Sequence, residues 1–196
     1  MKIIYLHGFA SAGSTGTATM LRNILYDKGV EVLSPDIPVS PKEAIAYLTS
    51  YIDQERPDLI IGTSMGAMYA EQMKGYRRIL VNPSFHMARL LTFRGMGRHE
   101  FRNKRQDGQK DFKVDKAMIA EFKEVEKAAL CHITPEEKAL VWGLFGKRDK
   151  NVNCQPDFKK AYGTDHFMVF DGEHYLNDTV LKRVVMPLIK DALGVF

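Results

Sequence analysis

The chain has 196 residues and a formal net charge of +4, with 45% hydrophobic and 27% charged residues. This balance is typical of a globular protein and excludes the fibrous and intrinsically disordered classes. We expect one domain over residues 1–196, because a chain of this length can bury a substantial core.

Short apolar runs alternate with longer segments of helical character, which is the pattern of a parallel sheet covered by helices. Strands are predicted at 2–6, 30–33, 59–61, 78–81, 140–145 and 167–170. Helices are predicted at 18–28, 42–54, 65–74, 156–162 and 176–193. Pro41 suits the first turn of the second helix, and Pro187 should kink or end the last one early. We therefore expect a six-stranded, mostly parallel sheet with helices on both faces. We place its strands in the order 2-1-3-4-5-6.

One stretch interrupts this alternation, since residues 82–134 contain no strand candidate. Residues 115–130 have apolar side chains at helical spacing. Residues 94–113 are polar, and whether they form a mobile lid is left open. We therefore expect a helical cap inserted at about residues 85–134. The excess charge of the chain lies there, with 11 lysines and arginines against 7 aspartates and glutamates.

The first apolar run is too short for a signal peptide or a membrane span, since it ends at a His-Gly pair at positions 7 and 8. We therefore expect a cytoplasmic protein without a membrane partner. The two cysteines, Cys131 and Cys154, lie far apart and outside any CxxC motif, which predicts reduced thiols. Homo-oligomerisation is left open.

Residues 62–66 form a GxSxG motif directly after an apolar run and before a helical segment. In this nucleophile elbow the serine, here Ser64, occupies a strained strand-to-helix turn at the top of a parallel sheet. Gly62 and Gly66 fit the motif because a Cβ at either position would collide with neighbouring backbone. The motif occurs by chance in about one chain in fifteen of this length, so its context has to carry the interpretation.

A nucleophilic serine needs a histidine base and a carboxylate that fixes the histidine tautomer. Asp149 and His174 each follow a predicted strand, so both should reach the same edge of the sheet as Ser64. Asp171 is the alternative acid, although its place three residues before His174 suits loop formation better. His166 precedes its strand and should lie at the opposite edge.

Two backbone N–H groups should stabilise the oxyanion that forms when the serine attacks. The Met65 N–H follows the nucleophile, and the Phe9 N–H, which we prefer to that of Ala10, lies in the loop after the first strand. His7 is expected to hold this loop by hydrogen bonds and not to act in catalysis.

Apolar residues of the insertion are candidates for an acyl pocket, because methionine adapts to irregular shapes. Met87 and Phe93 are the substrate-binding candidates there, with Tyr175 beside His174. Core packing remains the alternative explanation for the apolar residues.

Nucleotide, metal and cofactor sites are not predicted. There is no GxxxxGK[ST] or complete GxGxxG motif, and the six histidines are scattered. The basic insertion leaves another function open, in which a catalytically inactive scaffold binds an anionic partner through it. Phe93 and Phe101 lie among its arginines as stacking platforms would, yet a nucleic-acid partner is not favoured over a solvated cap.

The chain resembles the α/β-hydrolase superfamily, in particular the small bacterial YqiA-like esterases. The motifs that carry the resemblance are His7-Gly8-Phe9, the GxSxG motif, Asn82-Pro83-Ser84, Gly146-Lys147-Arg148-Asp149 and Gly172-Glu173-His174-Tyr175. The resemblance implies a compact hydrolase in which Ser64, Asp149 and His174 match the triad positions. It also implies a small-molecule ester or acyl thioester as substrate and no cofactor. Ala67 departs from the glycine common after the elbow, and the segment after Ser84 is longer than in small members, which leaves specificity open.

Overall fold

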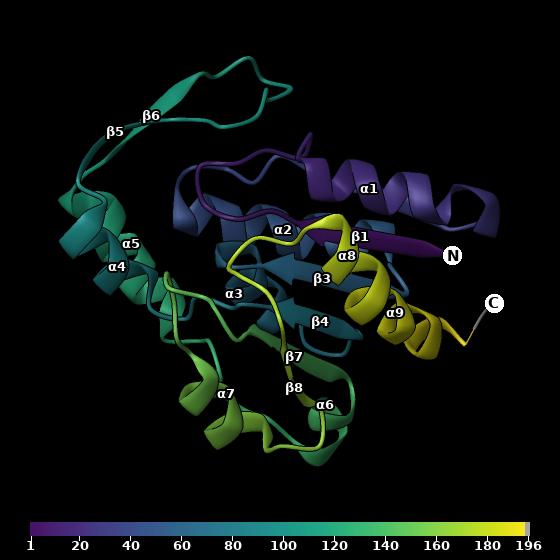
Figure 1. Ribbon diagram of the computed structural model, residues 1–196. Helices are drawn as coiled ribbons and strands as arrows, with labels where there is room; N and C mark the ends of the chain where they lie inside the picture. The colour runs from purple at the N-terminus through teal and green to yellow at the C-terminus, as the bar shows by residue number, and fades with distance from the viewer. Residues whose placement is uncertain (195–196) are drawn as a thin grey trace.

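A computed structural model describes residues 1–194 (Figure 1). Its main sheet has six strands in the order β2-β1-β3-β4-β7-β8, and every neighbouring pair is parallel. The strands are β1 (Lys2–Leu6), β2 (Glu31–Leu33), β3 (Leu59–Thr63), β4 (Arg78–Val81), β7 (Val141–Gly146) and β8 (Phe167–Phe170). The predicted strand order is confirmed.

The strands are apolar on both faces because helices cover both faces. Along β1, Ile3 and Tyr5 belong to one buried cluster while Ile4 and Leu6 belong to the other. The first cluster packs against helix α1 (Gly16–Leu25) and the C-terminal helices, and the second against α2 (Pro41–Glu55), α3 (Met65–Glu71) and α7 (Gln155–Tyr162). The sheet therefore lies between two helical layers.

Local sequence sets where the helices begin and end. Ser40 caps α2 by accepting the Glu43 N–H at 3.3 Å, and Pro41 occupies the first turn as predicted. Helix α1 begins two residues before the predicted start and gives way to a 3₁₀ turn, η1 (Tyr26–Lys28), which ends at Gly29 with a φ of 65°. Helix α3 ends at Glu71, three residues before the predicted end.

The predicted C-terminal helix is interrupted. It consists of α8 (Asp178–Val180), a π-helical turn η2 (Leu181–Val185) and α9 (Met186–Leu193). Pro187 explains the interruption, because proline lacks the N–H that would bond to the carbonyl four residues earlier and its ring crowds that carbonyl. In residues 1–194, no helix is both long and apolar enough to cross a membrane.

The segment between β4 and β7 contains strands that the sequence did not predict. Between α4 (Met87–Arg94) and α5 (Lys116–Glu126), strands β5 (Gly97–Glu100) and β6 (Asp111–Val114) pair as an antiparallel hairpin, and a short helix α6 (Pro135–Ala139) follows α5. Expecting no strand in residues 82–134 was therefore wrong. Each strand has four residues and places polar side chains on its exposed face, so its apolar signal was too weak.

The hairpin lies beyond the end of the sheet at which the parallel strands terminate, together with α4 and α5 (Figure 1). Its connection, residues 101–110, contacts the loop after β1. The Arg102 N–H donates to the Ala10 carbonyl at 2.9 Å, and the Ser11 hydroxyl donates to the Asn103 side chain at 2.8 Å. Buried Arg105 donates to the Ile37 carbonyl at 3.0 Å. This polar segment is thus joined by specific hydrogen bonds to the loops that follow β1 and β2.

Candidate active site

Ser64 lies between β3 and α3 in a backbone conformation that is rare for a residue with a side chain, with φ 54° and ψ −117°. The two flanking glycines make this turn sterically feasible. A Cβ on Gly62 would lie 2.5 Å from the Gly66 carbonyl oxygen, and one on Gly66 would lie 2.2 Å from the Leu6 carbonyl oxygen. Both obstacles are backbone atoms, so neither position accommodates a larger residue without moving α3 or β1.

Three side chains far apart in the sequence meet at this turn. His174 Nε2 lies 3.0 Å from Ser64 Oγ, and His174 Nδ1 lies 2.7 Å from Asp149 Oδ2. The side chains of His174 and Asp149 are only 9% and 5% exposed. Because an ionised carboxylate only accepts, His174 donates through Nδ1 and leaves the Nε2 lone pair for the serine hydroxyl. Such an arrangement can transfer a proton from Ser64 to His174.

Asp149 is held as an anion by its surroundings. Burial alone would raise the pKa of Asp149, but hydrogen bonds from His174 and from backbone N–H groups outweigh it and hold the pKa below the ordinary value. Asp149 Oδ1 accepts the N–H groups of Asn151 at 2.7 Å and Val152 at 3.2 Å. The carboxylate therefore stays charged and fixed in orientation at neutral pH.

The alternative residues lie elsewhere. Asp171 is 78% exposed in its side chain and forms an ion pair with Arg148. His166 stacks on Trp142 with ring centroids 4.5 Å apart, and its Nδ1 lies 3.1 Å from the Lys138 carbonyl oxygen. Neither residue is joined to His174 or Ser64.

The loop after β1 approaches the serine closely, since a Cβ on Gly8 would lie 3.5 Å from Ser64 Cβ. Phe9 follows Gly8 in this loop, and its ring packs edge-on against Phe112 of β6 at 5.3 Å. Met65 is the first residue of α3, so its N–H has no acceptor within the helix. The two candidate oxyanion donors thus flank the turn that carries Ser64.

His7 holds the loop after β1 by hydrogen bonds, as expected. Its Nε2 accepts the Ile37 N–H at 3.0 Å, which places the proton on Nδ1, and Nδ1 donates to the Gly8 carbonyl at 2.9 Å. Burial lowers the pKa of His7 to about 4. The neutral ring is therefore the form that the folded protein requires.

His7 makes folding stability dependent on pH. Its pKa is lower in the folded protein than the ordinary 6.5, so the unfolded chain binds the proton first as the pH falls. We expect the free energy of unfolding to fall by about 2 kcal/mol between pH 7.5 and 5, and His7→Gln to reduce that dependence. Urea denaturation at both pH values measures it, and an unchanged pH dependence in the variant would argue against this role.

Asn82 joins the loops that carry the acid and the base, a role that we did not predict from the sequence. Its side-chain amide donates to the carbonyls of Glu173 and His174, both at 3.0 Å, and its Oδ1 accepts the Gly146 N–H at 2.6 Å. Asn82 itself is buried and has a φ of 45°. The only signal was its place after β4, within a motif that carries the family resemblance.

A cavity of about 410 Å³ opens at Ser64 and His174. Met87, Leu90 and Leu91 of α4 form an apolar part of its wall, and Tyr175 lies at its edge. Phe93 does not line this cavity but a neighbouring cleft, and it is 78% exposed. On α4, Met87 and Leu91 lie one turn apart on one face, and Phe93 projects from another. The structure thus brings two of the three substrate-binding candidates to the serine.

Arginines of the insertion differ in their surroundings. Arg94 and Arg102 line the Ser64 cavity, and Arg102 donates to the Tyr175 hydroxyl across it. Arg98 and Arg105 pair instead with Asp111 and Asp107. The basic insertion is therefore partly neutralised, while two of its cations face the cavity.

Several solved structures share this fold. Est1E from Butyrivibrio proteoclasticus matches with a TM-score of 0.69 at 16% identity, over 98% of this chain and 88% of that chain. Alpha/beta hydrolase domain-containing protein 10 from mouse matches with a TM-score of 0.67 at 14% identity, over 98% and 89%. A thioesterase domain from the curacin biosynthetic pathway matches with a TM-score of 0.57 at 15% identity, over 98% and 90%. The protein therefore has an α/β-hydrolase fold.

The amino-acid sequence also matches a family model over most of its length. Residues 2–186 match the Uncharacterised protein family UPF0227, which is far more than half of the chain. The matched residues include Ser64, Asp149 and His174 together with the segment between β4 and β7. The chain belongs to the UPF0227 family.

Proposed function

We propose that the protein is a serine hydrolase that cleaves a carboxylic ester or thioester through an acyl-enzyme at Ser64. The observation that carries the proposal is the hydrogen-bonded series from Asp149 through His174 to Ser64, with distances of 2.7 and 3.0 Å. A serine hydroxyl is too weak a nucleophile alone, and a base fixed in the correct tautomer removes its proton during attack.

The chemistry has two half-reactions. Ser64 Oγ attacks the carbonyl carbon while its proton passes to His174 Nε2, and the resulting oxyanion accepts the N–H groups of Phe9 and Met65. The imidazolium then protonates the leaving alcohol or thiol, and the acyl group stays on Ser64. Water next attacks the acyl-enzyme, gives its proton to His174, and releases the acid with Ser64 restored. Asp149 stabilises the imidazolium in both halves.

We also propose that residues 1–196 form one domain in which residues 85–134 act as a cap over the site. The apolar wall of α4 suits an acyl chain, and Arg94 and Arg102 suit an anionic group of the substrate. The structural neighbours include Est1E with bound ferulic acid and a thioesterase domain, which supports a small ester or thioester substrate. The resemblance to YqiA-like esterases agrees with this class of reaction.

A fluorophosphonate probe tests the proposal directly, because it labels only an activated serine. We expect one label per chain at neutral pH, complete loss of labelling in Ser64→Ala, and normal labelling in Ser11→Ala, whose serine lines the same cavity. Absence of labelling in the wild type would favour the inactive scaffold that binds an anionic partner. A panel of p-nitrophenyl esters and acyl coenzyme A thioesters would then identify the substrate class.

A further inference from the structure

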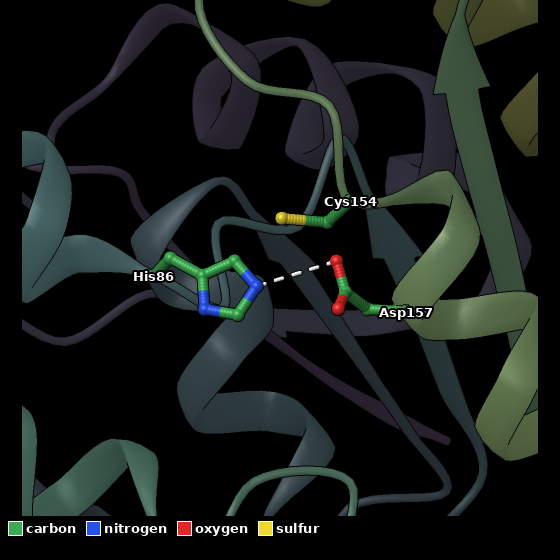
Figure 2. A group of neighbouring side chains, drawn as sticks. All are labelled: His86, Cys154 and Asp157. Atoms are coloured by element: carbon green, nitrogen blue, oxygen red, sulfur yellow. Dashed lines mark ion pairs between the residues drawn. The ribbon is translucent and has the colours of Figure 1, made fainter.

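Three side chains with metal-binding atoms meet outside the Ser64 cavity, although we predicted no metal site from the scattered histidines. They are His86, which precedes α4, Cys154, which precedes α7, and Asp157 in the first turn of α7 (Figure 2). Their ligand atoms all lie within 4.8 Å of one another. Figure 2 shows the sulfur, the imidazole and the carboxylate pointing toward a common space.

Local structure explains why they converge. Cys154 and Asp157 are three residues apart at the start of one helix, a spacing that places both side chains on the same face. His86 reaches them from the segment after β4. Imidazole, thiolate and carboxylate are the three ligand types that zinc uses in proteins, whereas calcium and magnesium take oxygen ligands.

The distance between two of the three ligand atoms fits tetrahedral coordination. Two ligand atoms about 2.0 Å from a zinc ion lie about 3.3 Å apart across a tetrahedral angle. His86 Nε2 and Asp157 Oδ2 are 3.3 Å apart. The side chains of these two residues are 55% and 36% exposed, so small rotations can bring them toward the buried sulfur of Cys154.

Acidic and basic groups both lie near the three ligands, since Arg89, Arg94 and Lys150 line the adjoining cleft. Besides Asp157, the carboxylates of Asp149 and Glu126 act electrostatically on the Cys154 sulfur. A cleft of about 450 Å³, lined by both His86 and Cys154, gives an ion access from solvent.

We propose that His86, Cys154 and Asp157 form a binding site for one zinc-like transition-metal ion, with the fourth coordination position open to solvent. The three ligands are not among the residues that line the Ser64 cavity, so we assign the ion no part in the chemistry at Ser64. It links the beginning of α4, which forms the apolar wall of that cavity, to the segment that follows Asp149. Bound metal therefore stabilises the contact between the cap and the acid loop, and this holds independently of the proposed hydrolysis.

Cobalt(II) is the probe of choice, because a thiolate ligand gives cobalt a charge-transfer absorption in the near ultraviolet. We expect the tag-free, reduced protein to bind one cobalt ion with this band, and zinc to displace it while excess magnesium does not. Cys154→Ser should abolish the band, and the matched variant Cys131→Ser should retain it. A band that survives in Cys154→Ser, or a wild-type protein that shows no band, would overturn the proposal.

A second pair of variants tests the site even if Cys154→Ser does not fold. His86→Ala and Asp157→Asn change partly exposed side chains and should each weaken cobalt binding at least about tenfold, because each removes one of three ligands. Zinc at about 100 times its dissociation constant should increase the folded-to-unfolded ratio of the wild type about 100-fold, and that of His86→Ala far less. Equal zinc stabilisation of both proteins would contradict the site, even with a thiolate band present.

Discussion

Replacing Asp149 by asparagine is expected to lower kcat/KM for the best ester substrate about 1,000- to 10,000-fold. An amide nitrogen at this position donates to His174 Nδ1, which drives the histidine proton to Nε2 and removes the lone pair that accepts the Ser64 proton. The negative charge that stabilises the imidazolium is lost as well. Because the amide oxygen can still accept the N–H groups of Asn151 and Val152, the loop should keep its structure.

Asp171→Asn is the matched control, since Asp171 is the other acid in the His174 loop. Its carboxylate is exposed and paired with Arg148, so the variant should retain activity within about twofold. Initial rates with a p-nitrophenyl ester, together with thermal unfolding of each variant, separate catalysis from stability. A large loss in Asp171→Asn with an active Asp149→Asn would reverse the assignment of the acid.

Sequence reasoning reached Ser64, Asp149 and His174 as candidates because each follows a strand, and parallel strands bring their carboxyl ends to one edge of a sheet. The parallel sheet covered by helices followed from the same alternation of apolar runs and helices. These inferences depend on local patterns, namely strand, turn and helix signals, which the sequence carries directly.

What the sequence did not predict depends on contacts between distant segments. The β5-β6 hairpin has few apolar residues, and hydrogen bonds to the loop after β1 hold its connection in place. Phe93 was assigned to the substrate as one of the apolar residues of the insertion, whereas the orientation of α4 turns it toward another cleft. His86 and Cys154 meet only because β4 and β7 are neighbours in the sheet.

Asn82 leads to the second prediction. Asn82→Ala should lower the free energy of unfolding by about 4 kcal/mol, because each of three hydrogen bonds, two of them fully buried, contributes about 1–3 kcal/mol when its partner is left unsatisfied. Alanine is also unfavourable at a φ of 45° by about 1 kcal/mol. Asn82→Gly removes the same hydrogen bonds without this strain and should be the less destabilised of the two in urea denaturation.

The effect on activity distinguishes positioning from stability alone. The Asn82 side chain bonds the carbonyls of Glu173 and His174 on one side and the Gly146 N–H on the other. Its loss therefore lets the base move relative to the acid and the serine. A displacement of about 1 Å costs up to about 100-fold in rate, and we expect Asn82→Gly to react with the fluorophosphonate probe about 10- to 100-fold more slowly well below its melting temperature. Asn82→Asp keeps the acceptor for Gly146 but turns a carboxylate toward two carbonyl oxygens, so it should be equally slow. If these variants unfold more easily yet label at the wild-type rate, Asn82 stabilises the fold without positioning His174.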